Sequence, residues 1–277
     1  MEMNKKADSQ IVVIGLADTH CHLFSDDYPD MREVIDRAAD AGVTRMLVAG
    51  CDIRTSIESV ELAERYSSLG VYAAVGVHPH EAANASGRLP DEIREMAQRS
   101  RVVAVGETGL DYYYDHSPRD QQRSCFRDHI RYALEIGKPL IIHGRDSYDD
   151  LRSILREETG GAAKGVVHCF SGTGEDAADL LDMGFFLSFG GPLTFKKSDS
   201  LRDLFRTLPE DRILLETDSP WLAPHPFRGK RNEPSYVRPV YERAAEIRGL
   251  TLEGLAVSMS NNAALLFGWG DATGGAR

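Results

Sequence analysis

The chain has 277 residues, of which 42% are hydrophobic, and a formal net charge of −11 at pH 7. This length and composition fit one large α/β domain with a sizeable core. The acidic balance argues against a protein that coats duplex DNA through broad charge attraction. The four cysteines form no Cys-x-x-Cys pair, which leaves a zinc knuckle unsupported. No apolar run has the length of a signal peptide core or a membrane span, so we expect a cytoplasmic protein.

Short apolar runs rich in β-branched residues alternate along the chain with amphipathic, charge-rich segments. The runs predict strands at 11–17, 44–49, 71–77, 102–106, 138–142, 164–168, 184–189 and 212–216. The segments between them predict helices at 30–41, 53–68, 90–100, 118–137, 146–158, 174–183, 198–207 and 234–249, with an extra helix at 251–267. A strand followed by a helix, repeated eight times, is typical of a (β/α)8 TIM barrel.

We therefore expect a single-domain α/β barrel over residues 11–268, with an extra C-terminal helix. A polar extension at 1–10 and a frayed tail at 269–277 are expected on either side of it. The alternative fold, a doubly wound open sheet, predicts a glycine-rich phosphate loop after an early strand. Neither G-x-G-x-x-G nor G-x-x-x-x-G-K-[ST] occurs in the sequence.

Imidazoles and carboxylates stand where the predicted strands end. The set consists of His20, His22, Glu107, His143, His168 and Asp218. Because the carboxyl ends of barrel strands meet at one mouth, we expect these six side chains to face one spot. A mixed nitrogen and oxygen set suits Zn²⁺, Mn²⁺, Co²⁺ or Fe²⁺, and six donors allow two ions with a bridging carboxylate. Taken singly, each residue has a structural alternative, such as a hydrogen-bonded histidine, a capping Glu107 or a turn at Asp218.

Two further residues extend this constellation. Asp18 lies two positions before His20 and is predicted to orient a ligand imidazole, although a solvated acid at a strand end is an equal alternative. His78, in the segment Gly76–His80, follows the third predicted strand and reaches the mouth. We expect His78 to contact the substrate.

In these residues and the segments around them, the chain resembles the TatD family of metal-dependent hydrolases, which belongs to the amidohydrolase-like barrels. The matching segments occur in the family's order: Asp18–Leu23, Gly76–His80, Gly106–Tyr112, Ile142–His143 with Arg145–Asp146, His168–Gly172, Pro192–Lys196, Glu216–Pro220, and Asn262–Ala263 with Leu266–Gly268. The departures are Trp221, where the family more often has Tyr or Phe, and Lys197, where Asn is common.

The resemblance implies two divalent ions, Mg²⁺, Mn²⁺ or Zn²⁺, as cofactors. It places one ion on His20, His22, Glu107 and Asp218, and the other on Glu107, His143 and His168, with Glu107 as the bridging ligand. It also implies a deoxyribonuclease of the exonuclease type, acting on single-stranded or frayed DNA through a metal-bridging hydroxide. In this scheme Asp218 is the general base.

A basic cluster in the segment Phe227–Asn232 stands out against the acidic whole. Phosphate contacts are expected from His225, Arg228, Lys230 and Arg231, and base stacking from Tyr112, Tyr113 and Trp221. Two other functions stay open: hydrolysis of a small amide, lactone or ester, and a non-catalytic metal-binding role. The intact set of six donors argues against a non-catalytic role. The basic loop favours the nuclease over hydrolysis of a small substrate. No membrane and no stable protein partner are expected.

Overall fold

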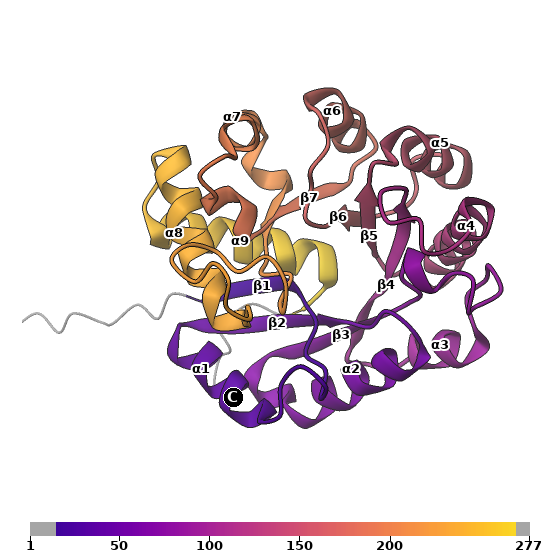
Figure 1. The fold of residues 1–277 in the computed structure, drawn as a ribbon, viewed down its shortest axis with the longest axis horizontal. Helices are drawn as coiled ribbons and strands as arrows, with labels where there is room; N and C mark the ends of the chain where they lie inside the picture. Colours follow the sequence, from indigo (N-terminus) through magenta and orange to yellow (C-terminus); the bar gives the residue numbers. More distant parts are fainter. Residues whose placement is uncertain (1–14, 270–277) are drawn as a thin grey trace, which may run out of the picture.

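The computed structural model describes residues 15–269 as eight parallel strands wound into a nearly closed barrel with helices outside it (Figure 1). The strands pair in chain order: β1 (Leu16–Cys21), β2 (Val43–Ala49), β3 (Val71–Val75), β4 (Val102–Asp111), β5 (Leu140–Arg145), β6 (Gly165–Val167), β7 (Phe186–Phe189) and β8 (Ile213–Leu215). The predicted TIM barrel is confirmed.

The helices alternate with these strands. They are α1 (Met31–Asp40), α2 (Ile53–Arg65), α3 (Asp91–Met96), α4 (Arg119–Ile136), α5 (Tyr148–Thr159), α6 (Gly174–Asp182), α7 (Asp199–Thr207), α8 (Val237–Arg248) and α9 (Leu252–Phe267). Short 3-10 turns are η1 (Ser67–Leu69), η2 (Pro79–Glu81), η3 (Gly191–Thr194), η4 (Glu210–Arg212) and η5 (Pro234–Tyr236). Capping residues fix where several helices begin and end. Asp52 and Thr55 form a capping box at the start of α2, and Gly137, with φ +67°, follows the last residue of α4.

Three strands differ from their predicted ranges in a way that matters for the site. β1 runs through His20, whereas the prediction ended at residue 17 and began at residues that lie outside the described part of the chain. β4 continues to Asp111, five residues past its predicted end, and β5 continues to Arg145, three residues past its predicted end. Pairing between them goes on from Thr108 opposite Ile142 to the ends of both strands. The polar residues at these ends are therefore strand residues.

The core has two layers, as the period-two alternation of strand side chains requires. On β2, Met46 and Val48 pack outward against the helices, while Leu47 and Ala49 join a separate cluster inside the barrel. Both layers are buried, which explains why the strands are continuous apolar runs.

Helix α9 and the residues just after it close the amino end of the barrel. Leu266 and Phe267 join the inner cluster, together with Trp269, which is 3% exposed. The Trp269 ring lies 5.1 Å from the ring of Tyr72, near the start of β3. The predicted frayed tail is thus wrong at Trp269, because its indole is packed; positions 270–277, and the predicted extension at 1–10, lie outside the described residues.

The barrel closes between β1 and the segment after β8. The His22 N–H donates to the Ser219 carbonyl at 2.7 Å, and the Asp218 N–H donates to the His20 carbonyl at 3.0 Å. These bonds carry Asp218 to the strand that bears the two histidines. Among residues 15–269, no helix has the length and apolar character needed to cross a membrane.

Candidate metal centre

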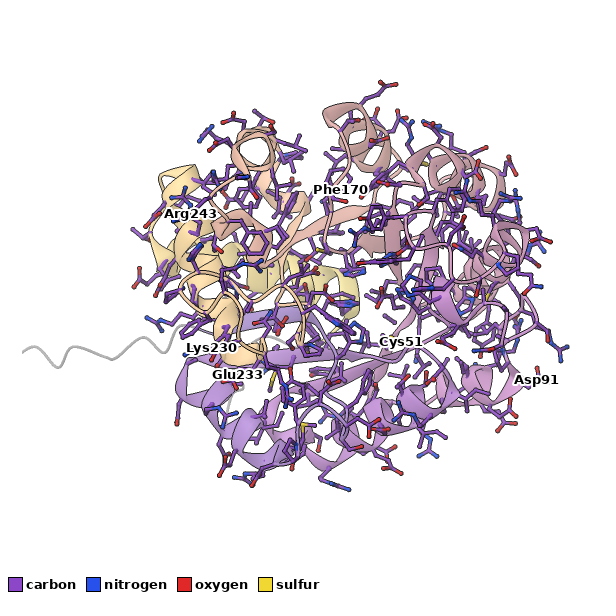
Figure 2. All side chains as sticks on the ribbon, viewed as in Figure 1. Cys51, Asp91, Phe170, Lys230, Glu233 and Arg243 are labelled. Atoms are coloured by element: carbon purple, nitrogen blue, oxygen red, sulfur yellow. The ribbon has the colours of Figure 1, made fainter. Side chains whose placement is uncertain are left out.

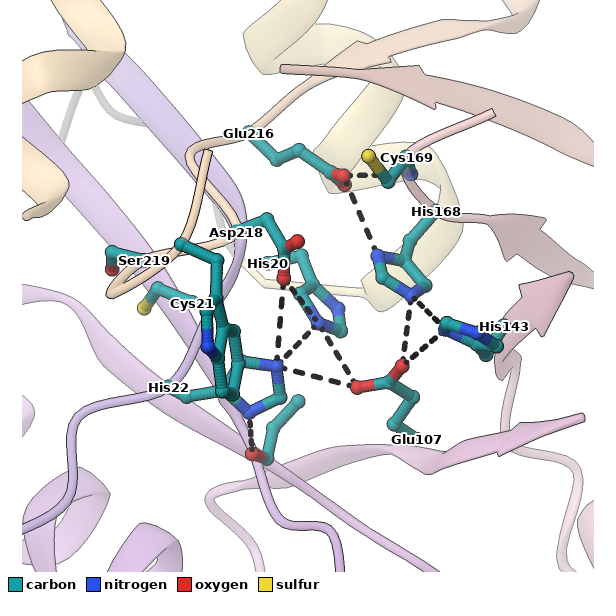
Figure 3. Close-up of polar contacts among 12 residues, drawn as sticks. His20, Cys21, His22, Glu107, His143, His168, Cys169, Glu216, Asp218 and Ser219 are labelled. Carbon is teal, nitrogen blue, oxygen red and sulfur yellow. Dashed lines mark hydrogen bonds and ion pairs between the residues drawn. The ribbon is translucent and has the colours of Figure 1, made fainter. Parts of the chain in front are cut away.

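The first donor group lies between β1 and the segment after β8 (Figure 3). The Nε2 atoms of His20 and His22 are 3.0 Å apart. They lie 3.2 and 3.3 Å from Oε2 of Glu107, and 3.8 and 3.6 Å from Oδ1 of Asp218. Four donor atoms from three distant segments therefore converge on one point.

The second donor group faces the other oxygen of the same carboxylate. Oε1 of Glu107 lies 3.0 Å from Nδ1 of His143 and 2.8 Å from Nε2 of His168. These two nitrogens are 3.3 Å apart. Figure 3 shows Glu107 between the two groups, with one oxygen directed to each. All six predicted donors are brought together.

Burial and unsatisfied atoms indicate that these residues fit divalent cations. Glu107 is 2% exposed, and its Oε2 takes no hydrogen bond from the described residues, although two imidazole nitrogens face it. A buried carboxylate oxygen without a donor is costly, and a cation bound there removes that cost. Sets drawn from these groups lie with all donor atoms within 4.8 Å of one another, such as His20, Glu107 and His168.

The two carboxylates are held in the charged form that metal ligands need. Burial opposes the charge of Glu107, but the imidazoles of His168 and His78 outweigh it, and the pKa of Glu107 falls well below its usual range. Burial likewise opposes the charge of Asp218, but a hydrogen bond from His22 and the field of His168 lower the pKa of that carboxyl.

The surroundings shift the pKa values of two of the imidazoles in opposite directions. Burial and the neighbouring His168 lower the pKa of His20, which favours the neutral ring that can bind metal. Burial also opposes the charge of His168, but the charges of Glu107 and Glu216 raise the pKa of His168 well above its usual value. A cation that binds His168 has to compete with a proton for the ring nitrogen.

His78 lies at the centre, as predicted for a residue at the mouth. Its Nε2 is 3.4 Å from Oε1 of Glu107, and its ring centroid is 4.6 Å from that of His143. This position puts His78 beside the second donor group.

Three site residues were missed by sequence reasoning. Buried Glu216 has its Oε1 3.5 Å from Nδ1 of His168 and accepts the Cys169 N–H at 2.7 Å. The Cys51 sulfur is 3.6 Å from Nδ1 of His22. Buried Asp111 contacts Nε2 of His143 at 3.1 Å. Two features of the sequence could have identified them. All three residues stand at or just after the ends of strands, and Asp111 and Glu216 also lie inside the segments that match the family.

Asp18 acts differently from the prediction. Its Oδ2 accepts the Thr217 hydroxyl at 2.6 Å, and its Oδ1 accepts the backbone N–H groups of Thr217 at 2.9 Å and His20 at 3.4 Å. No imidazole of the described residues contacts it, and Nδ1 of His20 has no hydrogen-bond partner. Burial raises the pKa of Asp18 to about 8. Asp18 therefore ties β1 to the segment after β8 through the hydroxyl and backbone N–H of Thr217.

The predicted phosphate-binding residues lie on the loop that leads from Asp218 to α8. Arg228 stacks on Phe195 with its guanidinium 3.9 Å from the ring centroid, and the His225 N–H donates to Thr194 Oγ1 at 2.9 Å. Lys230 is exposed on the stretch that precedes α8 (Figure 2), and Arg231 donates to the Asp27 carbonyl. Within residues 15–269 none of the four contacts the six donors, so their role stays a prediction.

Aromatic side chains stand at the carboxyl ends of the strands. Tyr113, Tyr114 and Trp221 are 58%, 50% and 53% exposed. The guanidinium of Arg145 lies over the Tyr113 and Tyr114 rings at 4.3 and 4.9 Å, and Trp221 meets His22 edge to face at 5.0 Å. The Tyr112 ring lies under the Arg119 guanidinium at 4.2 Å, and its hydroxyl donates to Asp150 at 2.6 Å, so its stacking role stays a prediction.

A TIM barrel with histidine and carboxylate donors gathered at the carboxyl ends of its strands is the arrangement of a metal-dependent hydrolase. The TatD related DNase family matches residues 17–268. The chain belongs to this family.

Individual relatives agree with that assignment. An uncharacterized metal-dependent hydrolase of Bacillus subtilis strain 168, YabD, is 45% identical over 253 residues, covering 91% of this chain and 98% of the relative. A 3'-5' ssDNA/RNA exonuclease TatD of Pantoea ananatis is 34% identical over 244 residues, covering 86% of this chain and 94% of the relative. The crystal structure of YJJV, a TatD homolog from Escherichia coli K12, superimposes with a TM-score of 0.85 at 29% identity, covering 94% of this chain and all of the other.

Proposed function

We propose that this metal-dependent hydrolase is a deoxyribonuclease that removes nucleotides from single-stranded or frayed DNA ends, using two divalent ions. The observation that carries the proposal is the pair of donor groups facing the two oxygens of Glu107. The similarity to a relative named as a 3'-5' ssDNA/RNA exonuclease supports the choice of substrate.

In this proposal each donor group would hold one ion, with one oxygen of Glu107 in each group. His20, His22 and Asp218 complete the first group, and His143 and His168 complete the second. When bound, two divalent ions lower the pKa of water and neutralise charge on a phosphodiester.

The chain's own residues supply the proton transfer. Oδ1 of Asp218 lies within 3.8 Å of both imidazoles of the first group, and the side chain is 13% exposed. Oδ1 would bind an ion, so the other oxygen of the charged Asp218 carboxylate is the one that would accept a proton from the attacking water. The positive φ of Asp218, +55°, is uncommon for a residue other than glycine and aims this side chain into the mouth.

Substrate binding would use the aromatic and basic side chains around the mouth. Tyr113 and Trp221 expose their rings for base stacking, and stacking does not depend strongly on the identity of the base. Arg228 and Lys230 supply positive charge on one loop for the sugar-phosphate backbone, and His225 on the same loop offers an imidazole for hydrogen bonding. Such local charge allows an acidic protein to hold a short single strand.

A gel assay tests this proposal. Single strands labelled at the 3′ or the 5′ end are incubated with metal-stripped protein and Mg²⁺, Mn²⁺ or Zn²⁺, with EDTA as the control. We expect stepwise shortening from one end with at least one metal and none with EDTA. Hydrolysis of a small ester, lactone or amide, with no cleavage of any strand, would contradict the nuclease and favour the alternative hydrolase.

A further inference from the structure

Asp111, the last residue of β4, is 1% exposed and uses both carboxylate oxygens. Its Oδ2 contacts Nε2 of His143 at 3.1 Å and Nε2 of His80 at 3.0 Å. Its Oδ1 accepts the backbone N–H groups of Tyr113 at 3.0 Å and Tyr114 at 2.9 Å. One buried carboxylate thus joins a proposed metal ligand to the turn that carries the exposed tyrosines.

The contact to His143 selects one form of the ring. A charged carboxylate only accepts hydrogen bonds, so the Nε2 atom that faces it must carry the proton. The charged Glu107 oxygen faces Nδ1 in the same way, so a cation between these two atoms would replace the second ring proton and use the Nδ1 lone pair, while Nε2 stays protonated toward Asp111. Nδ1 lies 3.0 Å from Oε1 of Glu107 and 3.3 Å from Nε2 of His168. Asp111 therefore holds His143 in the form that can bind the second ion.

The backbone that carries this carboxylate is itself held by a buried side chain. The Asp111 N–H donates to Oε1 of Gln122 at 2.8 Å, and the Gln122 amide donates to the carbonyls of Asp111 at 3.2 Å and Ser117 at 2.8 Å. Gln122 is fully buried on α4. A positioning residue needs such support, because a loosely held acceptor would not fix the ring.

The other oxygen fixes the wall of the mouth. The two N–H groups that it accepts belong to Tyr113 and Tyr114, whose rings lie under the guanidinium of Arg145. No carboxylate of residues 15–269 pairs with that guanidinium. The Tyr113–Tyr114–Arg145 wall therefore presents two exposed rings and a positive charge.

We propose that Asp111 is a positioning residue with two separable roles: its Oδ2 keeps Nδ1 of His143 available to the second ion, and its Oδ1 holds the Tyr113–Tyr114–Arg145 wall in place for a single strand. This inference rests on the proposed two-metal nuclease. Because each role uses a different oxygen, substitutions at this one position can separate them.

Asp111→Asn tests the first role. The asparagine oxygen can still accept the N–H groups of Tyr113 and Tyr114, but its NH₂ group then faces Nε2 of His143. That nitrogen must become an acceptor, which moves the ring proton to Nδ1 and blocks the ligand atom. We expect one of two Mn²⁺ sites to weaken about 10–100-fold, with little change in KM for a short single strand.

Asp111→Ala tests the second role. It leaves the turn without an acceptor, while a water in the polar gap can take the His143 proton. We expect KM for the strand to rise several-fold, and the loss of Mn²⁺ affinity to be smaller than in Asp111→Asn. Asp115→Asn is the matched control, because Asp115 lies in the same turn, is exposed, and pairs with Arg119 at 3.1 Å rather than with a histidine.

The measurement is calorimetry of MnCl₂ binding to the metal-stripped full chain. Two tight sites in wild-type protein and in Asp111→Asn would overturn this inference and leave the proposed function standing. Fewer than two sites in wild-type protein would overturn the two-metal proposal itself. If circular dichroism shows that Asp111→Asn does not fold, ¹⁵N spectra of Zn²⁺-loaded wild-type protein decide: a proton on Nε2 of His143 is expected, and a proton on Nδ1 overturns the inference.

Discussion

At the scale of single residues, the chemistry of this protein depends on Glu107. Imidazoles from β1 face one of its oxygens, and imidazoles from β5 and the end of β6 face the other. Its burial is tolerated because these four rings, and that of His78 at 3.4 Å from Oε1, surround it. Asp218 completes the first donor group, Asp111 contacts His143 of the second, and Oε1 of Glu216 lies 3.5 Å from Nδ1 of His168.

Asp218→Asn is expected to lower kcat for DNA hydrolysis by about 10²–10⁴-fold, the usual contribution of a general base. The amide keeps one oxygen that can face His20 and His22, so metal binding is expected to weaken but persist. Single-turnover kinetics together with metal analysis check this. Unchanged kcat would contradict the assignment of the base.

A buried histidine away from the site predicts how stability changes with pH. Nε2 of His129 accepts the Val77 N–H at 3.0 Å, and its Nδ1 lies 2.7 Å from the Cys125 carbonyl. Burial lowers the pKa of His129 to about 4 from 6.5. Between these values the unfolded chain binds a proton that the folded chain does not, so stability is present above pH 6.5 and is lost as the pH falls toward 4.

This loss is about 3 kcal/mol in the free energy of unfolding. Urea unfolding of wild-type protein and His129→Gln between pH 4 and 7.5 measures it as the difference between the two curves. We expect the wild-type protein to lose more stability than the variant over this range. Parallel curves would show that His129 does not contribute.

At the scale of elements, α9 and Trp269 seal the end of the barrel opposite the donors. Trp269→Ala removes an indole that packs on Phe267, with ring centroids 4.8 Å apart, and on Tyr72. The expected cost is about 3–5 kcal/mol, as for other buried Trp truncations. Denaturant unfolding checks it, with Val257→Ala as the control because Val257 is 61% exposed on α9. Equal stability of the two variants would contradict the sealing role.

The elements also explain how far the sequence could predict the fold and the site. Apolar runs mark buried strands, so the alternation of strands and helices was visible and the donors could be placed at one mouth. The strand ends were less visible, because β4 continues through Glu107, Thr108 and Asp111, polar residues that a periodicity argument places in a loop. Glu107 and Asp111 are buried with a partner, His143, that comes from the neighbouring strand β5.

Long-range partners are likewise the reason that some roles escaped prediction. Asp111 contacts His143, which is 32 residues away, and Asp18 contacts Thr217, which is 199 residues away. No local pattern reports such pairs. The substrate roles of His225, Arg228 and Lys230 and the cytoplasmic location stay predictions.

At the scale of the whole molecule, metal binding is expected to stabilise the fold, because the six donors converge only in the folded chain. Each Mn²⁺ supplied at one hundred times its Kd should add about 2.7 kcal/mol to the free energy of unfolding. Melting curves with added MnCl₂ and with EDTA measure this. An identical Tm in both conditions would contradict the metal centre.

The net charge of −11 gives a second prediction for the whole molecule. Because a strand must bind through local positive charge, kcat/KM for single-stranded DNA should fall steeply between 50 mM and 200 mM salt. The same range should leave hydrolysis of an uncharged small ester nearly unchanged. Equal salt dependence of both reactions would speak against phosphate contacts at the basic loop.

The most direct measurement is the anomalous scattering of a crystal grown with Mn²⁺. Two peaks are predicted, one against His20, His22 and Oε2 of Glu107, and the other against His143, His168 and Oε1 of Glu107. A single peak, or none at these side chains, would contradict a centre of two ions bridged by this carboxylate.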